Sequence, residues 1–406
     1  MARSRFNRGV FLLEGLNAIA TGLFFNYLFF FLKSEYGYTN RQNLLVGALN
    51  GLIYVPFALY GGKLGQKRGY LFALNLGFAL MAVSLIGGAF AKSAAAVLVA
   101  MSVWTVGMCF TWPNLEALAC DHQPPEALPG TIGVYNVVWS GAGALSLFGG
   151  GAVAQMFGWR SIFWIPVLIH VAQIVIALRM QSSWEKIAAT PQPRSSAHDE
   201  DPQGASFLKL AWLANPFAYI AINATIPLLP DLAVRFQLSP AFAGFFCSIW
   251  FFARAFTFVA LALWTGWHYQ FKYLALSFVG MLVSFVAMLL VPNLAAVVVV
   301  QLLFGWCLGL IYYSSLYYSM HVGETKGEHG GMHEAAIGVG IFGGPAIGAA
   351  SLYLAPGVEK SNVAGVGLVL AIGFIGLLAI RRASHRATRG SEQSRAMAAA
   401  DASGKT

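Results

Sequence analysis

The sequence predicts an all-α polytopic membrane protein in which twelve helices cross the bilayer. Of its 406 residues 58% are hydrophobic and only 10% are charged, whereas about a quarter of a soluble domain is charged. Its apolar runs reach the roughly 20 residues that a membrane-spanning helix needs, and they lack the alternation of the roughly 10-residue strands of a barrel. Long lipid-facing runs should be helical, because a helix satisfies its own backbone hydrogen bonds. A soluble enzyme, a disordered chain and a nucleic-acid-binding domain are therefore excluded.

A polar segment divides the expected spans into six and six. The spans are residues 9–33, 42–62, 70–91, 94–120, 129–157, 160–180, 207–230, 240–263, 271–292, 294–320, 331–355 and 361–381. We expect an N-terminal six-helix bundle over residues 1–180, a cytoplasmic linker over 181–206 and a C-terminal six-helix bundle over 207–381. Residues 382–406 are polar and rich in Ala, Ser and Arg, which predicts a disordered cytoplasmic tail.

The basic residues predict how the chain sits in the membrane. With twelve spans both termini lie on one side, and 18 of the 25 Lys and Arg residues fall on that side against 6 on the other. Cytoplasmic loops carry the excess of Lys and Arg, so we expect cytoplasmic termini in the cell (inner) membrane. The net charge of +9 is then explained by topology and attraction to lipid headgroups, and no nucleic-acid partner is expected. The four cysteines lie in apolar stretches without metal-ligand spacing, and there is no phosphate-binding loop, so neither a metal, a cofactor nor ATP-driven transport is expected.

Glycines and one short motif carry a family resemblance. After a shift of 197 residues, five glycines of the fifth expected helix and the loop before it coincide with glycines at the eleventh, which suggests two equivalent halves. Between the second and third expected helices stand Gly62, Lys63, Leu64, Gly65, Gln66, Lys67, Arg68 and Gly69. This stretch resembles the loop signature of the major facilitator superfamily, Gly-x-Leu-(Ala/Gly)-Asp-Arg-x-Gly. Gly62, Leu64, Gly65 and Gly69 match it, Lys67 supplies the basic residue, and Gln66 replaces the acid that helps latch the two halves in the family.

The resemblance implies two pseudo-symmetric six-helix bundles that rock about a central site by alternating access, in a chain that we expect to be monomeric. It also implies that helices 1, 4, 7 and 10 line the cavity, with helices 2, 5, 8 and 11 beside them. The eleventh helix holds Gly343, Gly344 and Pro345, similar to the glycine-proline motif that exporters of the family place on helix 5. Helix 5 has no proline among its glycines here, which weakens an exporter interpretation.

Arg254 is the clearest candidate for chemistry, because it stands in the middle of the apolar run of helix 8. An ionisable group in lipid costs roughly 2.5–3.5 kcal/mol on insertion scales, so such groups face a cavity or a partner. Arg254 would hold an anionic group of the substrate or pair with a proton-carrying acid. The alternative is a permanent structural ion pair between helices.

Two acidic residues on cavity helices are candidate proton carriers. Glu14 shares a face of helix 1 with Asn17 and Thr21, and Glu116 continues a stripe on helix 4 that includes Trp112. Both carboxylates stand toward the cytoplasmic ends of their helices, so the alternatives are interfacial solvation for Glu14 and pairing with a loop Lys or Arg for Glu116.

Polar and aromatic residues of helices 7 and 10 are candidate substrate contacts. Helix 10 carries Tyr312, Tyr313 and Tyr317, which suit sugar rings or amphipathic solutes, with packing or an interfacial aromatic belt as the alternative. Asn223 lies in a helix that its prolines should kink, as gates often are. His333 and Glu334 begin helix 11, where capping of the helix explains a carboxylate, and a coupling role for either residue is the alternative.

These features together predict a secondary active transporter of a small organic solute, driven by protons, and not an enzyme. The solute would be a sugar or an organic anion. Two alternatives stay open: a proton-coupled exporter of hydrophobic compounds, and a polytopic membrane receptor that does not transport.

Overall fold

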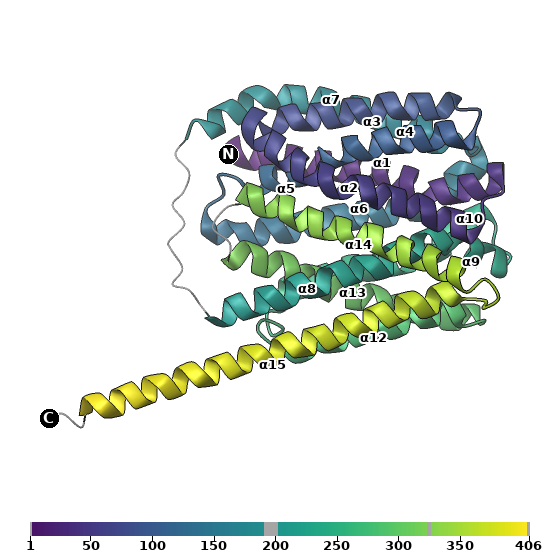
Figure 1. Ribbon diagram of the computed structural model, residues 1–406. Helices are drawn as coiled ribbons and strands as arrows, with labels where there is room; N and C mark the ends of the chain where they lie inside the picture. The colour runs from purple at the N-terminus through teal and green to yellow at the C-terminus, as the bar shows by residue number, and fades with distance from the viewer. Residues whose placement is uncertain (1, 191–201, 323–325, 404–406) are drawn as a thin grey trace.

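The computed structural model describes residues 2–190, 202–322 and 326–403. Every regular element among them is helical, and twelve helices or helix pairs are long and apolar enough to cross a membrane. They run side by side, and both chain ends lie on the left of Figure 1. We call that side of the molecule the termini end and the opposite side the far end.

The N-terminal bundle follows the expected spans closely. It comprises α1 (Ala2–Tyr36), α2 (Asn40–Arg68), α3 (Tyr70–Phe90), α4 (Ala94–Cys109), α5 (Trp112–Cys120), the 3-10 turn η1 (Pro125–Ala127), α6 (Leu128–Phe157) and α7 (Ser161–Ala188). The fourth span is interrupted at Phe110 and Thr111, just before Pro113, whose ring cannot continue the preceding turn.

The C-terminal bundle repeats this arrangement with more interruptions. It comprises α8 (Pro202–Thr225), the 3-10 turn η2 (Ile226–Leu228), α9 (Leu229–Arg235), α10 (Pro240–Cys247), α11 (Ile249–Leu263), α12 (Phe271–Leu290), α13 (Leu294–Val322), α14 (Lys326–Leu354) and α15 (Ser361–Ser403). The seventh span breaks at η2, where Pro227 and Pro230 follow each other closely. The eighth span breaks at Ser248, so Arg254 lies near the start of α11.

The structure corrects two expected boundaries beyond the bundles. α15 continues to Ser403, so the backbone of residues 382–403 is helical where a disordered tail was expected. Ala, Arg, Glu, Gln and Met dominate there, and all are strong helix formers. Likewise α7 runs to Ala188, so the first part of the expected linker is helical, and residues 191–201 of that linker lie outside the described residues.

Glycines set the close contact between the two bundles. A Cβ atom at Gly51 of α2 would overlap the backbone of Phe342 in α14, and one at Gly47 would meet Pro345 at 3.0 Å. At the neighbouring contact, a Cβ at Gly344 would overlap the backbone carbonyl of Ile220 in α8. The glycines of the eleventh span therefore let α14 fit tightly between α2 and α8, as small residues do between membrane helices.

Candidate functional site

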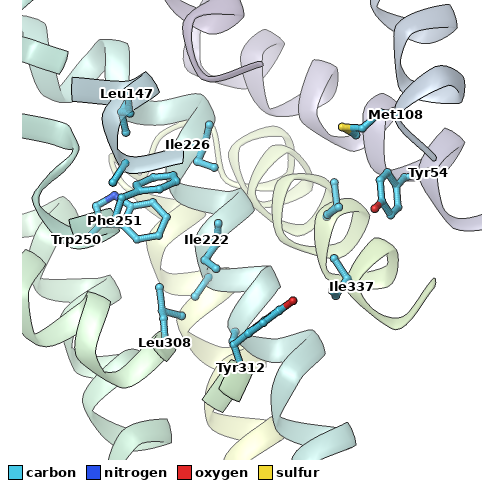
Figure 2. Packing of buried hydrophobic residues seen from close by; sticks show 14 of the residues in the cluster. Tyr54, Met108, Leu147, Ile222, Ile226, Trp250, Phe251, Leu308, Tyr312 and Ile337 are labelled. Atoms are coloured by element: carbon cyan, nitrogen blue, oxygen red, sulfur yellow. The ribbon is translucent and has the colours of Figure 1, made fainter. Parts of the chain in front are cut away.

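A cavity of about 190 Å³ lies between the two bundles. Figure 2 shows Tyr54, Met108 and Ile337 on one side of this region, and Phe251, Ile222 and Tyr312 on the other. Its walls come from α1, α2, α4, α5 and α6 of the N-terminal bundle and from α8, η2, α11, α13 and α14 of the C-terminal bundle. A cavity of roughly 150 Å³ holds a benzene molecule, so this one suits a single substituted ring.

Arg254 provides the positive charge of the cavity, and aromatic rings surround it. Its guanidinium carbon lies 4.6 Å from the ring centroid of Trp139, 4.9 Å from that of Phe251 and 5.4 Å from that of Trp250. A desolvated cation over an aromatic face gains about 2 kcal/mol. The rings therefore stabilise a guanidinium that is only 4% exposed.

The remaining bonding capacity of Arg254 is available to a ligand. Among the residues that the structure describes, no carboxylate lies within ion-pair distance of its guanidinium, and its Nε has no hydrogen-bond partner. Tyr219 and Tyr312 line the same cavity as Arg254. The structure thus separates Arg254 from the acids, and the expected pairing of Arg254 with Glu14 or Glu116 is not present.

Glu334 provides the negative charge of the cavity. It belongs to α14, is 8% exposed and accepts a hydrogen bond of 2.5 Å from the Tyr54 hydroxyl of α2. This bond joins the two bundles. Glu334 also interacts electrostatically with Glu116 and Glu14, so three acidic side chains influence one another in a volume of low dielectric.

The two acids that the sequence favoured lie behind the cavity wall. Glu14 is fully buried and its carboxyl interacts with Tyr135, which lines the cavity. Glu116 is 4% exposed, and its Oε1 has no hydrogen-bond partner among the described residues. Interfacial solvation therefore does not account for Glu14, and no loop Lys or Arg pairs with Glu116 in the described part of the chain.

Amides and hydroxyls add polar groups to an otherwise apolar wall. Asn223 lines the cavity and donates to the carbonyl of Tyr219 at 2.9 Å. Asn50 lines it from α2 and accepts from Thr105 at 2.7 Å. Asn17 lies deeper and donates to Thr111 at 3.2 Å, across the break in the fourth span.

The aromatic candidates separate into two groups. Trp112 and Tyr312 line the cavity, and both rings contact Trp139 of α6, with centroids 6.4 Å and 5.2 Å away. Tyr313 and Tyr317 do not line it. They pack instead on Trp267 in the turn after α11, at 5.7 Å and 5.3 Å between centroids. They belong to an aromatic cluster at the termini end.

The family signature forms a helix end rather than a loop. Gly62, Leu64, Gly65, Gln66 and Lys67 all lie in the last turns of α2, because only Gly69, at φ 97°, leaves the helical conformation. This differs from the expected loop, since most residues here are good helix formers.

Within that helix end, Gly65 is buried against the side chain of Asn114, which a Cβ would overlap. Asn114 in turn donates to the carbonyl of Gly61 at 3.0 Å. Gln66 and Lys67 are exposed. The signature thus holds α2 against α5 within one bundle.

Several cavity residues were not identified from the sequence: Tyr54, Tyr135, Trp139, Tyr219 and, as a site residue, Glu334. A tyrosine or tryptophan within an apolar helix has no sequence pattern that separates cavity lining from packing. Glu334 had a signal, since a carboxylate stood next to a long apolar run, but capping of the helix was the preferred explanation and a coupling role only the alternative.

Comparisons with known proteins give the family. Residues 10–215, half of the chain, match the model of the Major Facilitator Superfamily. The multidrug transporter mfsC of Aspergillus fumigatus is 24% identical over 147 residues, which are 36% of this chain and 28% of that protein. The methylenomycin A resistance protein of Bacillus subtilis is 28% identical over 132 residues, 32% of this chain and 28% of that protein. The match thus spans little more than a quarter of the length of these curated relatives.

Solved structures give the same fold over nearly the whole chain. A bacterial homologue of the human lysosomal transporter Spinster, in an inward-facing and unoccupied conformation, superposes with a TM-score of 0.66 at 14% identity, covering 96% of this chain and 97% of that one. The human organic anion transporter MFSD10 (TETRAN) gives 0.66 at 16% identity over 92% and 99%. At such identities the likeness establishes the fold alone. The family match, the twelve spans and this fold together show that the chain belongs to the major facilitator superfamily and is an integral membrane transporter rather than an enzyme.

Proposed function

We propose that this protein is a proton-coupled secondary transporter of a small aromatic organic anion. The observation that carries the proposal is Arg254, a buried cation at the cavity wall with aromatic rings around it and no acidic partner among the described residues. A charged group in a membrane is retained where it binds a substrate or an ion. A carboxylate or sulfonate would complete the bonding of Arg254, while its ring would stack in the aromatic surroundings.

The acids supply a route for coupling. Glu14, Glu116 and Glu334 are buried and influence one another electrostatically, so adding a proton to one lowers the repulsion among all three. Alternating access between the bundles would then move the proton with or against the anion. We expect the transporter to act as a monomer in the cell membrane, with both termini cytoplasmic.

The second candidate is export of hydrophobic compounds. It is favoured by the two curated relatives, whose names describe multidrug transport and antibiotic resistance, and by a lining in which apolar residues outnumber polar ones. An exporter of neutral compounds or cations leaves Arg254 without a role.

Transport by purified protein in liposomes under an imposed pH gradient tests the proposal. Radiolabelled salicylate serves as the aromatic anion, ethidium as the hydrophobic cation and glucose as the neutral sugar. Neutral salicylic acid enters liposomes by itself, so we expect accumulation of salicylate faster than in protein-free liposomes, and this excess should disappear when a protonophore removes the gradient. Flux of ethidium alone would favour the exporter, and binding of salicylate without any flux would favour a receptor.

A further inference from the structure

The hydrogen bond between Tyr54 and Glu334 joins α2 of the N-terminal bundle to α14 of the C-terminal bundle at the cavity wall. Tyr54 is 2% exposed and Glu334 is 8% exposed, so the bond is shielded from bulk water. The O–O distance of 2.5 Å allows a short hydrogen bond. When the carboxylate is ionised, such a bond is about twice as strong as a neutral one. Tyr54 is also held in place by Gly338 of α14, where an added Cβ would meet its ring at 3.0 Å.

The bond occupies a particular position along the contact between α2 and α14. These helices run antiparallel, and their other close contacts include Gly51 with Phe342 and Gly47 with Pro345. Both contacts lie on the far-end side of Tyr54, because α2 starts at the far end and runs toward the termini end. Parting of the bundles at the termini end would therefore strain the Tyr54–Glu334 bond before these glycine contacts.

Polar contacts also join the two bundles at the far end. Asn43 of α2 donates to the carbonyl of Pro227 at 3.3 Å, Lys33 of α1 lies 3.6 Å from Asp231 of α9, and the amide of Ala241 donates to Gln155 at 3.3 Å. Each of these contacts joins one bundle to the other. The Tyr54–Glu334 bond is their counterpart toward the termini end, and it contains a group that can be neutralised.

The groups around Glu334 leave its charge without a basic partner in the described part of the chain. Those that interact with its charge are Tyr54 from α2, Cys109 from α4, Glu116 from α5, Glu14 from α1, Tyr135 from α6, Tyr219 from α8 and Tyr312 from α13. His333, beside it on α14, has an unpaired Nε2 and packs against the Tyr312 ring at 5.8 Å. Since two of these groups are acids, a proton on Glu334 also relieves repulsion.

We propose that Tyr54 and Glu334 form a proton-operated bridge between the bundles. While Glu334 is ionised, its bond with Tyr54 holds the termini end closed. When a proton from the cavity binds the Glu334 carboxylate, the bond becomes a neutral one, Tyr54 keeps its own phenolic proton, and the termini end is released. The role of the bridge in transport rests on the proposed proton coupling, for which it names the group that binds the proton. Its effect on the conformation of the protein requires no substrate.

The distance between spin labels at the termini end tests the bridge without a ligand. Glu126 lies before α6 and Thr265 follows α11, and both are exposed. Cysteines placed at these two positions would be labelled first, because all four native cysteines are buried. In the wild-type background we expect the labelled pair to be close at high pH and to separate as the pH falls, with a change of about tenfold in the ratio of closed to open populations, the difference between a charge-assisted and a neutral bond.

Variants test whether the pH-dependent change in distance depends on the Tyr54–Glu334 bond. Glu334→Gln is neutral at every pH and should stay open throughout, and Tyr54→Phe should do the same because it removes the donor. Tyr60→Phe is the matched control, since Tyr60 lies on the same helix and is 56% exposed, and it should behave as the wild type. A wild-type pH response that persists in Glu334→Gln, or an equal effect of Tyr60→Phe and Tyr54→Phe, would overturn the proposal.

The proposed function can fail separately from the bridge. If liposomes show no salicylate flux while the distance still responds to pH through Glu334, the bridge stands and the substrate assignment falls. If flux is gradient-driven but the distance ignores Glu334, the coupling belongs to another acid and the bridge is wrong.

Discussion

The Arg254 guanidinium of α11 lies 4.6 Å above the Trp139 ring of α6, so a cation of the C-terminal bundle rests on an aromatic face of the N-terminal bundle. The two bundles thus share the stabilisation of the positive charge to which a substrate anion would bind. When the bundles move, this contact must change. Binding at Arg254 and the arrangement of the bundles are therefore linked by a direct contact.

Replacing Arg254 should remove affinity for the anion. A hydrogen bond to a charged group contributes about 1.5–3 kcal/mol, so we expect Arg254→Ala to weaken salicylate binding roughly 10- to 100-fold, measured by calorimetry on detergent-solubilised protein. Arg254→Lys keeps the charge but loses the planar stacking, so its affinity for salicylate should lie between those of the wild type and Arg254→Ala. Arg41→Ala, at an exposed arginine of α2, is the control and should bind as the wild type.

Neutralising a buried acid should abolish the coupling of transport to the pH gradient. Glu116→Gln keeps the shape of the side chain but cannot carry a proton, so we expect loss of gradient-driven accumulation while exchange of salicylate across the liposome membrane continues. Glu185→Gln, on the exposed end of α7, should leave both unchanged. Full accumulation in Glu116→Gln would remove this residue from the coupling.

Adding one methyl group at the contact between the bundles should destabilise the folded protein. A Cβ at Gly51 would overlap the backbone of Phe342, which cannot rotate away, and overpacking of this kind costs about 1–3 kcal/mol. Gly51→Ala should therefore lower the melting temperature of the purified protein. Gly87→Ala is the matched control, since nothing lies within 4 Å of its added Cβ. An unchanged melting temperature in Gly51→Ala would show that the bundles do not touch there.

The ion pair between Lys33 and Asp231 should stabilise the closed arrangement of the far end only weakly. The two side chains are 29% and 35% exposed, and such surface pairs contribute about 0–1 kcal/mol. Because Asp231 also pairs with Lys360 at 3.9 Å, the variant that isolates this pair is Lys33→Gln. We expect Lys33→Gln to increase far-end opening no more than about fivefold, read from spin labels at Lys92 and Pro292, which are exposed. High salt should reproduce the effect in the wild type. If high salt increases far-end opening as much in Lys33→Gln as in the wild type, the Lys33–Asp231 pair is not responsible for the salt effect.

Hydropathy was sufficient to predict the twelve spans, because the bilayer imposes length and composition on each helix separately. The same reasoning identified Arg254, since a charge in the middle of an apolar run is conspicuous. It failed where the answer depended on a partner far away in the chain. Glu334 appeared to be a cap of its helix, and only the packing of α14 on α2 reveals that Tyr54, 280 residues earlier, donates to it.

Local sequence features, such as glycines and neighbouring tyrosines on one helix, were the other source of error. Three glycines between residues 62 and 69 suggested a loop. In a tightly packed helix end, however, glycine allows close approach instead, as Gly65 does against Asn114. Tyr313 and Tyr317 were expected at the cavity together with Tyr312, although the helical spacing places them on another face of the same helix. Tyr313 and Tyr317 pack on Trp267 in the turn after α11, whereas Tyr312 lines the cavity.

The most direct test of the account is uptake of radiolabelled salicylate into proteoliposomes under an imposed pH gradient, compared between the wild type, Arg254→Ala and the control Arg41→Ala. The account predicts accumulation above the external concentration in the wild type and in Arg41→Ala, and only the background of protein-free liposomes in Arg254→Ala. Wild-type accumulation in Arg254→Ala, or no accumulation in any of the three, would contradict it.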